Sequence, residues 1–190
     1  MIQAHPDDLI FTSGGTEANH SVFHTFVNIP LDIKPHIVTV NTEHPSVLVP
    51  LRKLHTDGLI DLTVIPVSHK TGVAHYEDVL AALKPNQTVL VSVMLANNET
   101  GAISPIQQIV QSIREWERNV APSSLPLGRV FVHSDLAQAV GKLPVNVRSL
   151  GLDYATIVGH KLHSREDEEH RLSAAQENVW TTGQVLPVSV

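Results

Sequence analysis

Short apolar runs alternate with helix-like stretches along residues 9–158, and this alternation constrains the fold more than any other feature of the sequence. The clearest run, Thr88-Val-Leu-Val-Ser-Val-Met94, is almost unbroken, which is typical of a strand buried on both faces. Residues 105–118 instead carry apolar side chains at helical spacing, after a proline in the first turn. Strands that alternate with helices predict βαβ units and a mostly parallel sheet.

The same patterns predict the remaining elements. Strands are expected at residues 9–12, 36–40, 62–65, 129–132 and 154–158. Helices are expected at residues 16–27, 45 to about 56, and 76–83. The fold class is therefore α/β, with helices flanking a mostly parallel sheet.

Composition excludes several classes of function. With 13 Lys and Arg against 19 Asp and Glu, the net charge of −6 argues against nucleic-acid binding. The sequence contains 0 Cys, which excludes disulfides, zinc-thiolate sites and a cysteine nucleophile within it. No apolar stretch is long enough to span a bilayer, and no basic-then-apolar leader opens the sequence. We therefore expect no membrane partner and a cytosolic protein.

The composition changes after Lys161. Residues 163–171 form a dense run of mixed charge, and residues 174–190 show no clear periodicity. Such a segment buries too little apolar surface to offset the entropy lost on ordering. We expect one domain over residues 1–161 and a divergent, disordered tail over residues 162–190.

Ser13-Gly14-Gly15-Thr16 follows a predicted strand and opens a predicted helix. Free N–H groups at a helix N-terminus, together with Ser and Thr hydroxyls, suit an oxyanion such as phosphate. A tight turn capped by Thr16 is the structural alternative. A P-loop is excluded because Glu17 and Ala18 stand where its Lys would follow, and the three-glycine dinucleotide fingerprint is also absent.

Asp135 comes after a predicted strand, at the edge of the sheet where ligands of open α/β folds bind. Gln138 lies three residues on, so a helical turn would place both side chains on one face. A carboxylate and an amide there could hold opposite edges of a heteroaromatic ring. A helix-capping role for Asp135 is the alternative.

Three more strand ends carry polar side chains, at His44, at Asn97-Asn98 and at His160-Lys161. A lysine facing a crevice can form a Schiff base, although a lysine at a strand end is more often solvated. The structural alternatives for the others are a loop histidine and an Asn-Gly turn. We find no paired ligand spacing on one helix, so we expect no metal site.

Taken together, these residues supply a phosphate cup, a ring stacker, a carboxylate with an amide, and a lysine, all after strands of one sheet. Pyridoxal phosphate needs this set of groups. The sequence therefore predicts pyridoxal 5'-phosphate as cofactor.

Five segments resemble the class V aminotransferase family, in particular its cysteine desulfurases and selenocysteine lyases. They are Phe11-Thr-Ser-Gly-Gly-Thr-Glu-Ala-Asn19, Thr42-Glu-His-Pro45, Met94-Leu-Ala-Asn-Asn-Glu-Thr-Gly101, His133-Ser-Asp-Leu-Ala-Gln-Ala-Val-Gly-Lys142 and Ile157-Val-Gly-His-Lys161. Their order and spacing match across roughly residues 5–161. The resemblance implies part of the large domain of the aspartate aminotransferase-like fold of pyridoxal-phosphate-dependent transferases.

The resemblance also implies roles for the site residues. Lys161 would bind the cofactor as a Schiff base and later carry the Cα proton. Asp135 would keep the pyridine nitrogen protonated, so that the ring can act as an electron sink. Gln138 would hydrogen-bond the ring oxygen, with Asn98 near the same oxygen or the substrate.

His44 would stack on the ring face and assist protonation, which makes it a second catalytic candidate beside the lysine. Gly15, Thr16 and His160 would hold the phosphate. Desulfurases often place a phosphate-binding Ser three positions before the lysine, where this sequence has Val158. That difference leaves the expected phosphate cup one donor short.

Within the family, the long stretch at residues 115–129 and the segment at 156–161 favour the lyase branch, which converts L-selenocysteine to L-alanine and releases selenium. Cysteine desulfurase is the alternative. Compared with the family, the sequence looks truncated at both ends, so an inactive fragment or a regulatory partner of a full-length subunit is a further alternative. The resemblance implies a homodimer.

Overall fold

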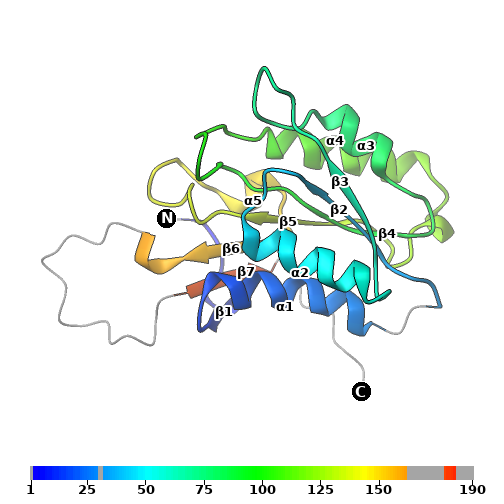
Figure 1. Ribbon diagram of the computed structural model, residues 1–190, viewed down its shortest axis with the longest axis horizontal. Helices are drawn as coiled ribbons and strands as arrows, with labels where there is room; N and C mark the ends of the chain where they lie inside the picture. Colours follow the sequence, from blue (N-terminus) through cyan, green and yellow to red (C-terminus); the bar gives the residue numbers. More distant parts are fainter. Residues whose placement is uncertain (1, 30–31, 162–177, 183–190) are drawn as a thin grey trace, which may run out of the picture.

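A seven-stranded sheet organises the computed structural model, which describes residues 2–29, 32–161 and 178–182 (Figure 1). At Pro6, at His160 and over residues 178–182, only the backbone is described. The strand order is β1-β7-β6-β5-β4-β2-β3. The strands are β1 Leu9–Thr12, β2 His36–Val40, β3 Asp61–Ile65, β4 Thr88–Ser92, β5 Phe131–Asp135, β6 Tyr154–Val158 and β7 Asn178–Thr182.

Strands β2 to β6 run parallel, and β7 lies antiparallel between β6 and β1. Every residue of β2, β4, β5 and β6 is buried, as the near-continuous apolar runs predict. Because parallel strands end at the same edge, the loops after β2, β4, β5 and β6 gather on one side of the molecule.

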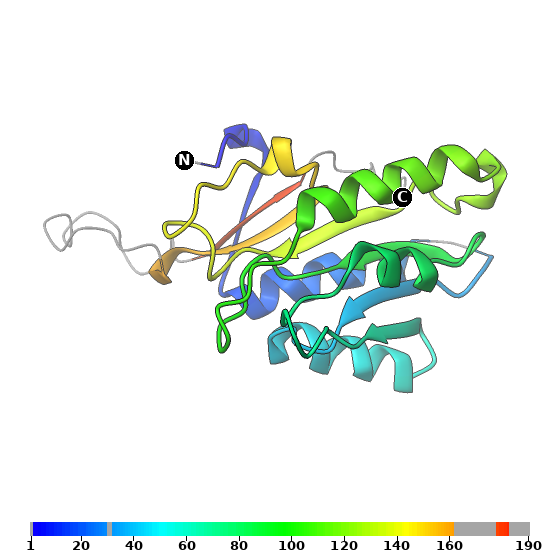
Figure 2. The same ribbon diagram turned by 90° about the horizontal axis from the view of Figure 1, so that it is seen from above.

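Helices cover both faces of the sheet, as Figure 2 shows for α1 and α2 below it and α4 above it. The helices are α1 Gly15–Asn28, α2 Pro45–Thr56, α3 Tyr76–Ala82, α4 Ile106–Asn119 and the single turn α5 Val147–Leu150. Short 3₁₀ turns lie at Pro6–Asp8, Pro122–Ser124 and Gly159–Lys161.

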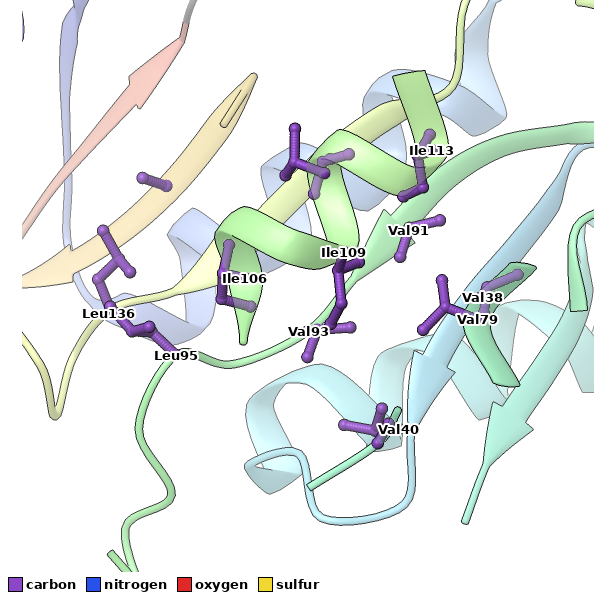
Figure 3. Close-up of a cluster of buried hydrophobic side chains, with 14 of the residues drawn as sticks. Val38, Val40, Val79, Val91, Val93, Leu95, Ile106, Ile109, Ile113 and Leu136 are labelled. Atoms are coloured by element: carbon purple, nitrogen blue, oxygen red, sulfur yellow. The ribbon is translucent and has the colours of Figure 1, made fainter. Parts of the chain in front are cut away.

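Alternate residues of the strands contribute their side chains to two apolar cores. In β2, Ile37 packs towards α1 and α2, whereas Val38 belongs to the core under α3 and α4. Figure 3 shows the second core, with Ile106 and Ile109 of α4 against Val93. The predicted α/β fold with a mostly parallel sheet and flanking helices is confirmed.

Three elements differ from the sequence-based expectation. Strand β5 runs from Phe131 to Asp135 and not over residues 129–132, so Asp135 is the last residue of the strand. The four-residue α5 is too short for periodicity to detect. Strand β7 forms within the stretch expected to be a disordered tail, because Asn178-Val-Trp-Thr-Thr182 has β propensity and completes two ladders. The charge run at 163–171 lies outside the described residues.

Candidate functional site

A cavity of about 150 Å³ opens at the carboxyl edge of the sheet. Its lining comes from the residues that follow β1, β2 and β4 and from the ends of β5 and β6. The lining residues are Gly15, Thr16, His44, Ser46, Met94, Asn98, Asp135, Ala137, Gln138, Val158 and Lys161. Seven of the eight predicted site residues are on this list, and the side chain of the eighth, His160, lies outside the described part.

Helix α1 directs its N-terminus at the cavity through Gly15 and Thr16. Gly14 is the N-cap, and no described side chain caps this end of the helix, so the structural alternative of a turn capped by Thr16 does not form. Glu17 accepts hydrogen bonds from the Ser13 hydroxyl and amide, both at 2.6 Å, and these bonds lower its pKa. Amide groups at an uncapped helix start suit an anion.

Gly15 also has a steric reason to be glycine. A Cβ on Gly15 would lie 2.8 Å from Cγ2 of Val158, closer than ordinary packing allows. Val158 is itself a lining residue. A side chain at position 15 would therefore occupy the space that Val158 fills, and only glycine leaves the backbone at the helix start open to a ligand.

Asp135 ends β5 and is buried, with 6% of its surface exposed. Oδ1 accepts a hydrogen bond from the Ala137 amide at 2.9 Å. This bond caps a turn, so the capping role that was the alternative for Asp135 is present in that form. Oδ2 accepts from Asn19 Nδ2 at 3.1 Å. Each carboxylate oxygen can accept a second hydrogen bond, so Asp135 keeps capacity for a ligand.

His44 is the N-cap of α2, a role that the sequence did not indicate. Its Nδ1 atom accepts from the Ser46 amide at 3.1 Å and lies 2.8 Å from Ser46 Oγ. Asn19 Nδ2 donates to the same hydroxyl at 2.9 Å. The histidine that we expected to stack on a ring is therefore fixed by a helix cap and a serine.

Gln138 lies in the turn after β5, and its Oε1 accepts from Lys142 Nζ at 2.7 Å. A lysine ammonium only donates, so this contact orients the amide and leaves the Gln138 NH₂ group as a donor with no partner among the described residues. Asn98 is exposed at the rim. The neighbouring Asn97 organises that loop instead, since its Oδ1 accepts from the amides of Glu99 and Thr100.

Glu43 lies behind the cavity and was not predicted as a site residue. Its Oε1 accepts from the Met94 amide at 2.5 Å, and its Oε2 has no hydrogen-bond partner in the described part of the chain. Burial raises the pKa of Glu43 well above its usual value, and the nearby Asp135 raises it further. The bond to Met94 ties the loop that carries His44 to the end of β4.

Sequence reasoning thus missed Asn19, Ser46 and Glu43, which hold the expected residues in place. Asn19 had a signal, because it follows Gly15 by four residues and so shares its face of the helix. Glu43 directly precedes the histidine in Thr42-Glu-His-Pro45. Among the described residues, no group of three or more His, Asp or Glu side chains could hold a metal ion.

Fold and site define an α/β protein with a cavity, lined by charged, polar and apolar residues, at the carboxyl edge of a mostly parallel sheet. The family model for "Aminotransferase class-V" matches residues 1–166, so the chain belongs to this family. The resemblance expected from the five segments is confirmed.

The relatives extend this result. A selenocysteine lyase of Xenopus laevis is 44% identical over 175 residues, covering 86% of this chain and 40% of that protein. A mitochondrial cysteine desulfurase of Candida maltosa is 37% identical over 163 residues, covering 86% of this chain and 31% of that protein. The chain therefore spans well under half the length of these relatives.

Among solved structures, "SspA in complex with cysteine" superposes with a TM-score of 0.77 at 25% identity, covering 95% of this chain and 45% of that one. The fold is thus shared with less than half of the larger chain. No helix in the described residues has the length and apolar character needed to cross a membrane.

Proposed function

We propose that the cavity binds pyridoxal phosphate, and that this chain supplies the cofactor-binding part of a lyase acting on L-selenocysteine. The observation that carries the proposal is the single cavity lined by Lys161, Asp135, Gln138, His44 and the start of α1. These groups were expected on separate strand ends, and they lie around one space.

The residues present fit the cofactor. A phosphate would meet the uncapped start of α1, where Gly15 leaves the backbone open and Thr16 adds a hydroxyl. Asp135 has unused acceptor capacity for a protonated ring nitrogen. The Gln138 NH₂ group is a free donor for a ring oxygen. Each part of a phosphorylated pyridine therefore has a complementary group.

When bound, pyridoxal phosphate supplies an aldehyde that binds amines and a ring that accepts electrons from Cα. Lys161 would provide the amine that holds the cofactor and would afterwards carry the proton at Cα. Asp135 would hold a proton at the ring nitrogen by charge pairing. His44 would face the ring, and its Nε2 would be the nitrogen left to donate, because Nδ1 accepts from the Ser46 amide. Val158 contributes an apolar wall where an additional phosphate donor was expected.

For the whole protein, we propose cleavage of the Cβ–Se bond of L-selenocysteine, with release of L-alanine and elemental selenium. The identity of 44% to a selenocysteine lyase against 37% to a cysteine desulfurase supports selenium. Cysteine is the second candidate substrate. The solved structure "SspA in complex with cysteine", which shares the fold, supports an amino acid of this kind as substrate.

We further propose a homodimer in the cytosol. An open cavity of about 480 Å³ adjoins the site, shares Asn98 and Gln138 with it, and includes Ile103. Ile103 is 55% exposed, which suits an interface. Light scattering should give a dimer mass that falls to the monomer mass in Ile103→Lys. A monomer for the unaltered chain would contradict the dimer, and cell fractionation tests the compartment.

Absorbance spectroscopy tests cofactor binding. Purified chain is titrated with pyridoxal phosphate beside Lys161→Ala and the control Lys70→Ala, which alters an exposed turn. We expect a visible band of bound cofactor in the unaltered chain and in Lys70→Ala, and none in Lys161→Ala. A band of equal strength in Lys161→Ala would overturn the proposal.

A further inference from the structure

Two amide hydrogens of one buried residue, Asn19, reach two different groups of the cavity. Asn19 lies on α1 with 0% of its surface exposed. Its Nδ2 donates to Asp135 Oδ2 at 3.1 Å and to Ser46 Oγ at 2.9 Å. The opposite orientation of the amide would turn its oxygen towards the carboxylate, which only accepts when ionised. The charge of Asp135 therefore fixes which way Asn19 points.

The next contacts allow only one direction of donation. The Ser46 backbone amide donates to His44 Nδ1 at 3.1 Å, and an amide N–H cannot accept. His44 Nδ1 must therefore present its lone pair. The Ser46 hydroxyl, 2.8 Å from the same nitrogen, then donates its proton to it and accepts from Asn19. The contacts agree with one another in this direction alone.

We propose that Asn19 and Ser46 are positioning residues that hold the Asp135 carboxylate and keep neutral His44 in the tautomer with its proton on Nε2. Nδ1 is occupied as an acceptor, so Nε2 is the polar ring atom left for a ligand, and it carries a hydrogen. A ligand that contacts Nε2 therefore contacts a hydrogen-bond donor and not a base. The use of this donor in catalysis rests on the proposed function, whereas the tautomer does not.

Nitrogen NMR of the histidine rings tests the tautomer without any cofactor. The sequence has 12 histidines, so the spectrum of His44→Gln identifies the His44 signals. Above the titration range of histidine, we expect an unprotonated Nδ1 and a protonated Nε2 in the unaltered chain. A proton on Nδ1, or an even mixture of tautomers, would overturn the proposal.

Two variants test the chain of hydrogen bonds from Asn19 through Ser46 to His44, which we call the relay. Ser46→Ala removes the hydroxyl and keeps the backbone amide, and Asn19→Leu removes both amide hydrogens at similar volume. We expect the Nδ1 signal of His44 to move in both variants, because its hydrogen bonding changes. Ser21→Ala on α1 is the matched control, since Ser21 Oγ donates only to the Glu17 carbonyl at 2.9 Å. An Nδ1 signal that stays in place in folded Ser46→Ala contradicts the relay, whatever happens to Asn19→Leu.

A cofactor titration separates this inference from the proposed function. If the NMR result holds and no chain binds pyridoxal phosphate, the relay stands and the proposed function fails. If the unaltered chain binds the cofactor but His44 carries its proton on Nδ1, the relay fails alone. If the chain binds pyridoxal phosphate and the NMR result holds, we expect the affinity for pyridoxal phosphate to fall by about fivefold or more in Asn19→Leu. The cause would be the loss of one hydrogen bond to Asp135.

Discussion

Histidines in two regions of this molecule are held in different ways. Inside the sheet, His133 is fully buried and both ring nitrogens meet hydroxyls, Ser92 Oγ at 2.8 Å and Thr156 Oγ1 at 3.1 Å. His36 is held similarly, by the hydroxyls of Thr88 and Thr63. At the carboxyl edge, the hydrogen bonds of His44 occupy Nδ1.

The difference separates histidines held inside the sheet from the groups that we propose to bind the cofactor. In the interior, both ring nitrogens of His133 and of His36 have hydroxyl partners, as burial favours. At the edge, the Asp135 carboxylate, the Gln138 NH₂ group and Lys161 retain capacity around one cavity. With 12 histidines in the chain, residue type alone does not single out His44, whereas its position at the cavity, with hydrogen bonds only at Nδ1 among the described residues, supports its proposed role.

The first prediction concerns the carboxyl edge of the sheet. Asp135→Asn removes the charge that would pair with the protonated ring nitrogen of the proposed cofactor and that accepts a hydrogen bond from Asn19. Removing one partner of a buried, hydrogen-bonded charge pair costs about 2 kcal/mol or more, so we expect about 30-fold weaker binding of pyridoxal phosphate. Absorbance titration measures this, with Asp57→Asn as a surface control. Unchanged affinity in Asp135→Asn would show that the carboxylate at the edge does not bind the cofactor, and would contradict the distinction drawn between edge and interior.

The interior is expected to respond to acid. Burial lowers the pKa of His133 to about 3, against an ordinary value of 6.5. The unfolded chain then binds the extra proton first, so the free energy of unfolding falls as the pH drops from 6.5 towards 3. We expect His133 to account for about 2–3 kcal/mol of loss between pH 6 and pH 4.

Urea unfolding at several pH values checks this expectation. His133→Gln cannot take up the proton, so its loss of stability over the same range should be smaller by that amount. The exposed His69 provides the control, because His69→Gln should keep the full dependence on pH. An equally steep fall in His133→Gln would contradict the burial argument.

At the start of α1, Gly15→Ala should destabilise the fold by about 1–3 kcal/mol, because its Cβ would lie 2.8 Å from Val158 Cγ2. Val158→Ala in the same chain should restore part of the loss by making room. Thermal and urea unfolding measure both variants. If the double variant is no more stable than Gly15→Ala alone, the two side chains do not share the space as described.

The last prediction has the opposite dependence on pH. Burial raises the pKa of Glu43, so its carboxyl is protonated in the fold at pH values where the unfolded chain has lost that proton. Stability from Glu43 is full below its ordinary pKa and is lost as the pH rises through the raised value. Glu43→Gln mimics the protonated form, keeping an acceptor for the Met94 amide.

We therefore expect Glu43→Gln to be more stable than the unaltered chain at pH 8 and equal to it at pH 4. Denaturant unfolding at the two pH values gives the comparison. A variant that is less stable at pH 8 would show that the ionised carboxylate is the form that the fold stabilises.

Much of the fold could be predicted, because buried parallel strands such as residues 36–40 and 154–158 are short runs rich in apolar and β-branched residues. Strand β7 could not, since its five residues gain their stability from two neighbours distant in sequence. For the site, strand ends indicated Asp135 and Lys161. Asn19 and Glu43 act through contacts between residues 27 or more positions apart, which no local pattern encodes.

The most direct measurement is to identify which lysine holds the cofactor. Purified chain is incubated with pyridoxal phosphate, reduced with borohydride and digested, and the modified peptide is identified by mass spectrometry. The account predicts the pyridoxyl group on Lys161, at the edge where the other lining residues meet. Modification spread over the exposed lysines, with Lys161 unmodified, would contradict it.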